Sequence, residues 1–183
     1  MSDTQQTYLD TFPTWLRNLG EDAEALAACL PEDKLPRSAR EAIAGGLNYL
    51  FKSLDLIPDG VDEIGYLDDA FVLRVAAELA TREDVSDLPP EKLRGLNRLA
   101  EEVELVRQFL ENDGDRLESY VKGLRKGAAR GRAVDDILDD DGVQSDFLND
   151  LNTFAKSYEP PAFGREEKNL IKLRAFFDAK LPK

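Results

Sequence analysis

Histidine is absent from the 183-residue chain, and cysteine occurs once. Ser–His and Cys–His nucleophile activation are therefore excluded, as are zinc sites that use histidine. One thiol can form neither an internal disulfide nor a thiolate metal site, so any bound metal would be a hard ion held by oxygen. We expect Cys29 to be a buried structural thiol and the compartment to be the reducing cytoplasm.

Long apolar runs and basic charge are also scarce. No run approaches the ~20 residues that a membrane-spanning helix needs, and the net charge is −13. Residues 1–112 hold 11 basic and 23 acidic side chains. This disfavours nucleic acid as a partner, because phosphate contacts need a basic face.

Helical periodicity runs through nearly the whole chain, and no run of alternating β-branched residues indicates a strand. We predict an all-α, single-domain bundle of about seven to nine helices. Residues 1–160 would form the main all-α domain, and residues 161–183 a C-terminal amphipathic helix packed on it. Ser38 and Glu41 are spaced as a capping box for a helix that runs to about Ser53. A seam at 3,4,3,4 spacing predicts a long packing helix from Pro90 and comprises Leu96, Leu99, Val103, Val106 and Leu110.

The segment Ser53–Leu73 concentrates acidic charge and contains no Lys or Arg. Its six carboxylates belong to Asp55, Asp59, Asp62, Glu63, Asp68 and Asp69. Because Pro58 forces Ile57 out of the helical region, this segment must contain a helix–helix connection. Such crowded acids repel one another unless a cation, a helix N-terminus or basic side chains offset the charge.

Two short sequences in this segment, DLIPD at 55–59 and GYLDD at 65–69, resemble the signature of the YkvA-like family, domain of unknown function 1232. The resemblance covers about residues 43–83 and has no established activity attached to it. The residues that carry it are Asp55, Pro58, Asp59, Gly65, Tyr66, Asp68 and Asp69.

These aspartates have two interpretations. In the first they are turn and cap residues: Asp59 follows Pro58 in a turn, Asp68 or Asp69 caps the next helix, and basic partners neutralise Asp55. The candidate partners are Lys52, Arg74, Arg40 and Arg37. In the second, Asp55, Asp59, Asp68 and Asp69 converge on one divalent cation, Mg²⁺ or Ca²⁺. No cofactor is firmly indicated.

A basic segment, residues 119–134, contains five bases, no acid after Ser119, and glycines at every fourth position, 123, 127 and 131. On a helix these glycines would permit a close helix contact beside a solvated basic face. In a loop their N–H groups could cradle an anion, with Lys122, Arg125, Lys126 and Arg130 around it. The acids of residues 135–141 that follow have the DDxxD spacing of a Mg²⁺–diphosphate motif but are more typical of a solvated capping cluster.

The last apolar stripe contains Leu170, Leu173, Phe177 and Leu181 and predicts a final core helix. Its alternative is a helix that contacts a partner or a membrane surface. From the whole sequence we expect a non-enzymatic interaction or regulatory module, with a protein partner or a second copy of the chain as its ligand. The alternative is a divalent-cation-dependent enzyme that acts on a phosphate ester through the four aspartates.

Overall fold

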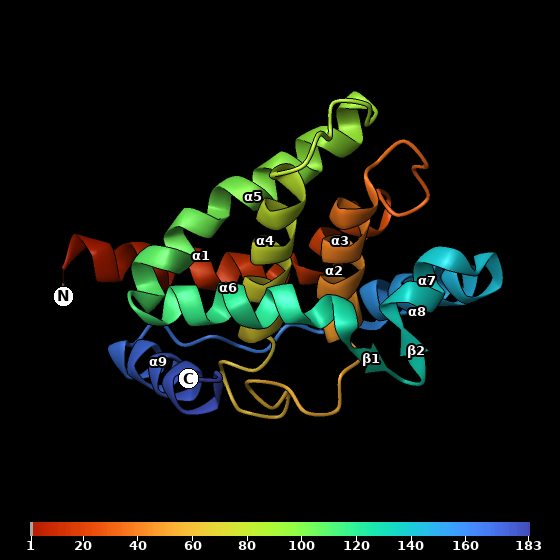
Figure 1. Ribbon diagram of the computed structural model, residues 1–183. Helices are drawn as coiled ribbons and strands as arrows, with labels where there is room; N and C mark the ends of the chain where they lie inside the picture. The colour runs from red at the N-terminus through yellow and green to blue at the C-terminus, as the bar shows by residue number, and fades with distance from the viewer. Residues whose placement is uncertain (1) are drawn as a thin grey trace.

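Helices make up most of the chain in the computed structural model, which describes residues 2–183 (Figure 1). In chain order they are α1 (Asp3–Arg17), α2 (Leu19–Ala27), α3 (Arg37–Tyr49), α4 (Leu67–Thr81), α5 (Pro90–Leu110), α6 (Asp113–Gly123), the 3₁₀ helix η1 (Leu124–Lys126), α7 (Val134–Asp139), α8 (Asp141–Ser157) and α9 (Glu167–Lys180). The prediction of a mostly all-α fold is confirmed. No helix within the described range is long and apolar enough to cross a membrane.

A small β-hairpin lies in the basic segment, for which the sequence left a helix and a loop as alternatives. Strand β1 (Ala128–Ala129) pairs antiparallel with β2 (Arg132–Ala133). Gly123 ends α6, Gly127 follows η1, and Gly131 lies in the hairpin turn. The three glycines therefore do not line one helix face, and the expectation that the chain has no strand is wrong.

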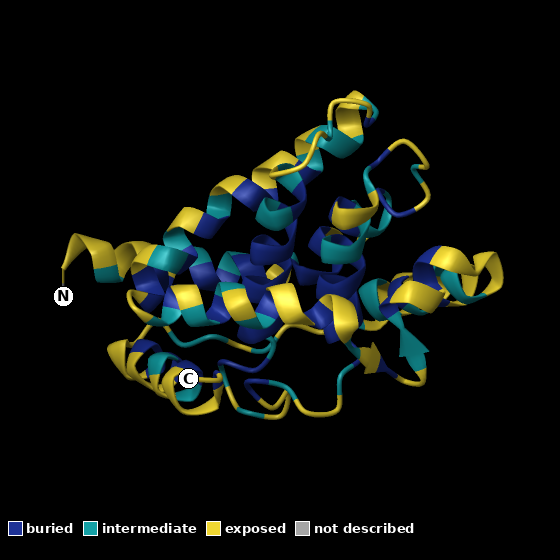
Figure 2. Ribbon diagram, viewed as in Figure 1, coloured by how far each residue is buried: buried dark blue, intermediate teal, exposed yellow. Residues whose placement is uncertain are grey.

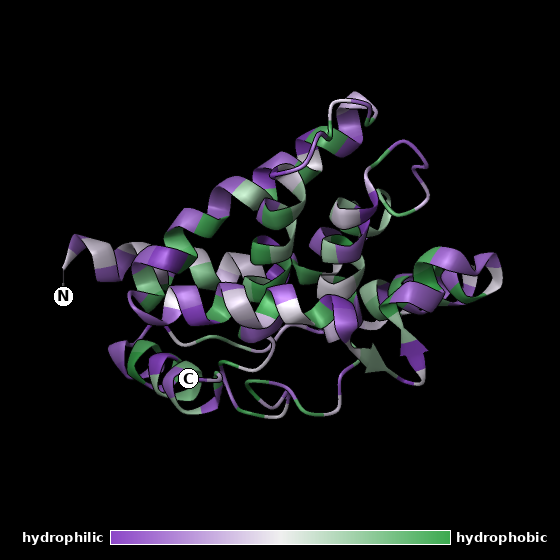
Figure 3. Ribbon diagram, viewed as in Figure 1, coloured by the Kyte–Doolittle hydropathy of each residue, from purple (hydrophilic) through white to green (hydrophobic). Residues whose placement is uncertain are grey.

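Helix α4 is the centre of the bundle. It packs most extensively against α3 and α5, and the dark blue interior of Figure 2 follows it. In Figure 3, hydrophobic residues, in green, alternate with hydrophilic ones along the ribbons of the surrounding helices. Such an all-round buried helix needs apolar residues on every face, and α4 has only Asp68, Asp69 and Arg74 as buried charged exceptions.

Aromatic rings connect α4 with three other helices. The Phe71 ring of α4 lies 5.2 Å from Phe12 of α1, 6.0 Å from Phe109 of α5 and 5.2 Å from Phe177 of α9, between ring centroids. Leu173 and Phe177 are fully buried. The C-terminal apolar stripe is thus used in the core of the protein.

A buried ion network holds the same helices together. The Arg74 side chain is almost fully buried; its Nη2 donates to Asp22 at 3.0 Å and its Nε to Glu102 at 2.8 Å. Arg98 also donates to Asp22, at 2.7 Å. The guanidinium carbon of Arg74 lies 3.9 Å from the centroid of the Trp15 ring. Arg74 therefore joins α1, α2, α4 and α5 at one point, and it is not a partner of Asp55.

The predicted seam of α5 is confirmed, since all five of its residues are buried. Cys29 is buried as well, and burial raises the pKa of its thiol to about 11, as expected of an inert structural cysteine. The prediction of a capping box formed by Ser38 and Glu41 is wrong. Helix α3 begins at Arg37 after Pro36 and has no side-chain cap, because the N-cap is Pro36, two residues before Ser38.

Candidate functional site

The connecting loop, residues 50–66, joins α3 to α4 and brings the two halves of the family signature together. Leu56, Ile57 and Ile64 are buried and anchor the loop beneath the bundle. In Figure 1 the loop runs below α3 and α4 in yellow and orange. Its far side lies beside the segment before α9, since Asp59–Glu63 share a surface hollow with Pro161 and Lys168.

Asp68 ties this loop to both helices. Its Oδ2 accepts a hydrogen bond from the Tyr49 hydroxyl at 2.5 Å and another from the Ile57 N–H at 3.2 Å. The Tyr49 oxygen in turn accepts the Leu56 N–H at 2.7 Å. Asp68 is fully buried, so one carboxylate satisfies groups from the end of α3, the loop and the start of α4.

Asp68 and Asp69 do not cap α4, which corrects the prediction. The N-cap residue is Tyr66, with a left-handed φ of 68° and no side-chain cap. Asp68 and Asp69 lie in the first turn instead, where the helix dipole still favours acidic side chains. The cap failed as a prediction because the chain enters the helix at Leu67, before either acid.

Gly65 and Tyr66 each make a different contact that explains the residue type at its position. A Cβ on Gly65 would lie 2.3 Å from the Asp59 carbonyl oxygen, so only glycine permits this close approach of the two backbones. The Tyr66 ring lies 5.2 Å from that of Tyr158, between ring centroids, and burial and then the nearby Asp59 charge raise the pKa of its hydroxyl. Together they hold the outer end of the loop against the C-terminal part of α8.

Four carboxyl groups, of Asp55, Asp59, Asp68 and Asp69, form what we call the aspartate cluster. Its members differ in solvent exposure: Asp59 is exposed, Asp55 is half-buried, and Asp68 and Asp69 are buried. These side chains lie close enough together for each carboxyl group to influence the pKa values of the others. The four carboxyl groups therefore form one interacting set.

Burial is the main cause of the raised pKa values in the cluster. It raises the pKa of Asp55 to about 7, with further increases from the charges of Asp68 and Asp59. The pKa of Asp68 rises to about 6 by burial, against the lowering effect of the Tyr49 hydrogen bond. Burial and then the Asp68 charge raise the pKa of Asp69 well above its usual range.

Basic side chains do not neutralise the cluster as predicted. Arg40 donates to the Leu30 carbonyl, and Arg37 pairs with Glu41, Asp135 and Asp139. Lys52 donates to the Tyr120 hydroxyl at 3.1 Å, and its charge lowers the pKa of Asp55 by less than burial and the neighbouring aspartates raise it. Arg37 and Arg40 therefore serve other partners, and Lys52 offsets the charge of Asp55 only in part.

Three oxygens of the cluster are buried without a hydrogen-bond partner, one each on Asp55, Asp68 and Asp69. These are the atoms that a divalent cation would bind, because carboxylate oxygen suits a hard ion. Over residues 2–183, however, no three acidic side chains are placed together as metal ligands. The four predicted ligands lie near one another, but their placement is not that of a metal site.

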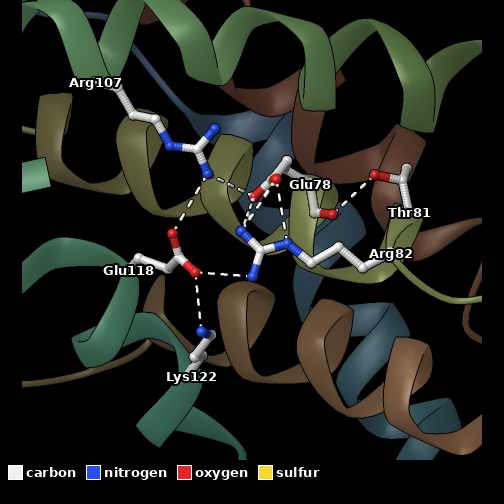
Figure 4. A network of polar contacts seen from close by, with 6 residues as sticks. All are labelled: Glu78, Thr81, Arg82, Arg107, Glu118 and Lys122. Atoms are coloured by element: carbon white, nitrogen blue, oxygen red, sulfur yellow. Dashed lines mark hydrogen bonds and ion pairs between the residues drawn. The ribbon is translucent and has the colours of Figure 1, made fainter. Parts of the chain in front are cut away.

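The four predicted anion-binding bases are not gathered at one site: Lys122 and Arg125 line one cavity, and Arg130 lines another. Figure 4 shows Lys122 in an ion network in which Glu118 also accepts from Arg82 and Arg107, and the two arginines also reach Glu78. The hydrogen bond from Arg82 is the main cause that lowers the pKa of Glu118 to about 2. Lys122 is thus already paired, at 2.9 Å.

The remaining bases of that set face different hollows. Arg125 lines a cavity of about 230 Å³ with Lys122 and Arg82. Arg130 lines another, beside the hairpin. The acids that follow them act locally: Asp140 caps α8 by accepting the Gly142 and Val143 N–H groups, which agrees with the capping interpretation.

Sequence reasoning missed Tyr49 as a site residue. The only signal was an aromatic residue with a hydroxyl six positions before Asp55, at the end of an apolar helix face. Tyr158 was missed as well; its hydroxyl donates to the Leu16 carbonyl at 2.8 Å while its ring contacts Tyr66.

Comparison with known proteins supports the family resemblance for this part of the chain. The family described as "Protein of unknown function (DUF1232)" matches residues 39–74. This range contains most of α3, the connecting loop and the first half of α4, and so the whole aspartate cluster and Tyr49. No curated protein and no solved structure gives a match.

Proposed function

We propose that the protein is a non-enzymatic interaction or regulatory module in which the aspartate cluster fixes the connecting loop as a rigid platform. The observation that carries this proposal is the use of Asp68. Its carboxylate accepts hydrogen bonds from the Tyr49 hydroxyl and the Ile57 N–H, which are groups of the protein itself. The signature residues thus have a structural task that needs no substrate.

The second candidate is a divalent-cation-dependent enzyme that acts on a phosphate ester. It is favoured by the unpartnered buried oxygens of Asp55, Asp68 and Asp69. Against it, Asp68 and Asp69 are buried beneath the loop, so a substrate could reach them only after the loop had opened. The raised pKa values of these groups also oppose cation binding, because protons compete with a metal for the carboxylates.

Calorimetric titration with Mg²⁺, Ca²⁺ and Mn²⁺ separates the two candidates. The wild type is compared with the double variant Asp55→Asn/Asp69→Asn and with the control Asp62→Asn/Asp87→Asn, which removes the same charge at exposed positions. Hydrolysis of p-nitrophenyl phosphate is measured with each metal. We expect no saturable micromolar binding and no metal-dependent hydrolysis. Saturable binding and hydrolysis that only the Asp55/Asp69 variant loses would make the enzyme the better proposal.

A further inference from the structure

A groove lies between the chain segment that follows α3 and the β-hairpin. It is lined by Phe51–Leu54 on one wall and Ala128–Gly131 on the other, and its volume is about 430 Å³. We call it the hairpin groove. The hairpin is held in place by two contacts: the Asn48 side chain donates to the Arg132 carbonyl at 3.1 Å, and Arg132 pairs with Asp150 at 2.8 Å.

The opposite wall is fixed by the aspartate cluster. Leu54 is followed directly by Asp55, and the next two N–H groups, of Leu56 and Ile57, are bound to Tyr49 and Asp68. Both walls are therefore positioned before any ligand arrives. A preformed site loses less conformational entropy on binding and so binds more tightly.

The hairpin turn places an arginine at the rim of the groove. Arg130 and Gly131 form the two-residue turn, with φ of 50° and 74°. Such turns favour Asn-Gly or Gly-Gly, because a left-handed φ is costly for a residue with a long side chain. Here Arg occupies the first position, and its guanidinium carbon lies 4.6 Å from the centroid of the Phe51 ring. Unfavourable backbone conformations of this kind concentrate at functional sites.

The groove is basic, although the protein carries a net charge of −13. None of its lining residues is acidic. Within residues 2–183, neither Arg130 nor Lys52 has a carboxylate within salt-bridge distance, and Arg125 and Lys126 just before the hairpin have none either. A guanidinium stacked on an aromatic ring keeps its N–H groups free for bidentate contact with a carboxylate.

The groove also exposes apolar surface. Leu54 is 83% exposed and is one of the two large hydrophobic side chains that are exposed in the described chain. Ala128 is exposed beside it. A small inorganic anion would leave this surface in water, whereas a peptide with an apolar side chain next to its acids would cover it.

We propose that the hairpin groove binds an acidic peptide segment of a partner protein. One carboxylate binds Arg130, a second binds Lys52, and an apolar side chain between them packs on Leu54. This proposal rests on the proposed interaction function and names its partner by chemistry: a surface segment in which acidic residues flank a leucine-like residue. The complementary charge on an otherwise acidic protein gives the contact its selectivity.

Fluorescence anisotropy with labelled peptides tests this proposal. The probes are four octapeptides of glutamate with one leucine at successive central positions, and the controls replace that leucine by serine or every glutamate by lysine. The protein variants are Arg130→Gln and Leu54→Ser. Their matched controls are Arg94→Gln, another exposed arginine without an ion pair, and Ile171→Ser, the other exposed large hydrophobic residue.

We expect at least one glutamate–leucine peptide to bind with a Kd below about 1 mM. The Arg130→Gln change should weaken it about tenfold, as expected for the loss of one charge-assisted hydrogen bond. Leu54→Ser should abolish the preference for leucine over serine, and the two control variants should bind as the wild type does. Added salt should weaken the interaction.

Three results would overturn the proposal. The first is that no peptide binds at concentrations up to about 1 mM. The second is that the groove variants bind the peptide as tightly as their controls do. The third is that tripolyphosphate displaces the peptide while leucine and serine peptides bind equally, which would make the groove a phosphate site. None of these results involves metal. The peptide assay therefore tests the groove, whereas the metal titration and the hydrolysis assay test the proposed non-enzymatic function.

Discussion

The raised pKa values of the aspartate cluster predict an unusual dependence of stability on pH. In most proteins carboxylates have lowered pKa values in the folded state, so stability rises with pH. Here the folded pKa values of Asp55 and Asp68 are about 7 and about 6, above the ordinary value of 3.8. The folded state then binds more protons than the unfolded state between pH 4 and 7. The free energy of unfolding should therefore be greatest near pH 4 to 5 and fall as pH rises through 6 to 7.

The change in the free energy of unfolding can be worked out from Asp68, the more buried of the two groups. One pKa unit corresponds to about 1.36 kcal/mol, so the rise for Asp68 from 3.8 to about 6 is worth about 3 kcal/mol between pH 4 and 7. Asp55 adds less than its shift suggests, because its partly exposed carboxyl is screened by water. The absence of histidine leaves this pH range free of imidazole titration.

Urea unfolding followed by circular dichroism at pH 5, 6, 7 and 8 measures this dependence. The test variant is Asp69→Asn, whose amide is a neutral substitute of the same shape for the buried Asp69 carboxyl group. We expect it to flatten the decline and to be more stable than the wild type at pH 8. The control, Asp62→Asn, makes the same Asp-to-Asn exchange at an exposed position in the same loop, so it accounts for general charge repulsion. Wild-type stability that is constant or rises from pH 5 to 8 would refute the raised pKa values of the cluster, as would two variants with the same pH profile.

Three further predictions concern the loop and its supports. Gly65→Ala should destabilise the protein by about 1–3 kcal/mol, because its Cβ would clash with the Asp59 carbonyl, whereas Gly60→Ala, where no atom lies within 4 Å, should be close to neutral in the same denaturation assay. Tyr49→Phe should cost about 1–3 kcal/mol and speed amide exchange in residues 55–57, since it leaves buried polar groups unpaired; unchanged exchange would contradict the role given to Tyr49. Phe177→Ala should cost about 3–5 kcal/mol by leaving a cavity beside α4, and a melting temperature equal to that of the wild type would show that α9 is not part of the core.

The sequence was sufficient for the helices and for much of the core, and insufficient for the contacts between distant residues. The α5 seam could be predicted because 3,4 spacing directly encodes one helix face. Caps at Ser38 and Asp68 failed because Pro36 and Tyr66 begin their helices earlier than residue type alone indicates. The hairpin was missed because its two-residue strands contain only alanine and arginine, which carry no strand signal.

The aspartate cluster shows the same limit. Its four members were identified from their crowding, and the structure does bring them together. Their lack of an arginine partner could not be predicted, because the sequence does not reveal that Arg74 faces Asp22 and Glu102. That choice depends on where α2 and α5 pack, which is a property of the whole bundle.

The contact between Arg74 and Trp15 gives the protein an internal optical reporter. Trp15 is the only tryptophan, and its indole lies against a guanidinium that belongs to α4. Arg74 follows Asp69 by five residues, about 7.5 Å along the same helix. A shift of α4 that accompanies a change in the loop would alter the charge and the packing around this indole. Emission from a single site would then report, without any added label, on the helix whose first turn holds the two buried aspartates.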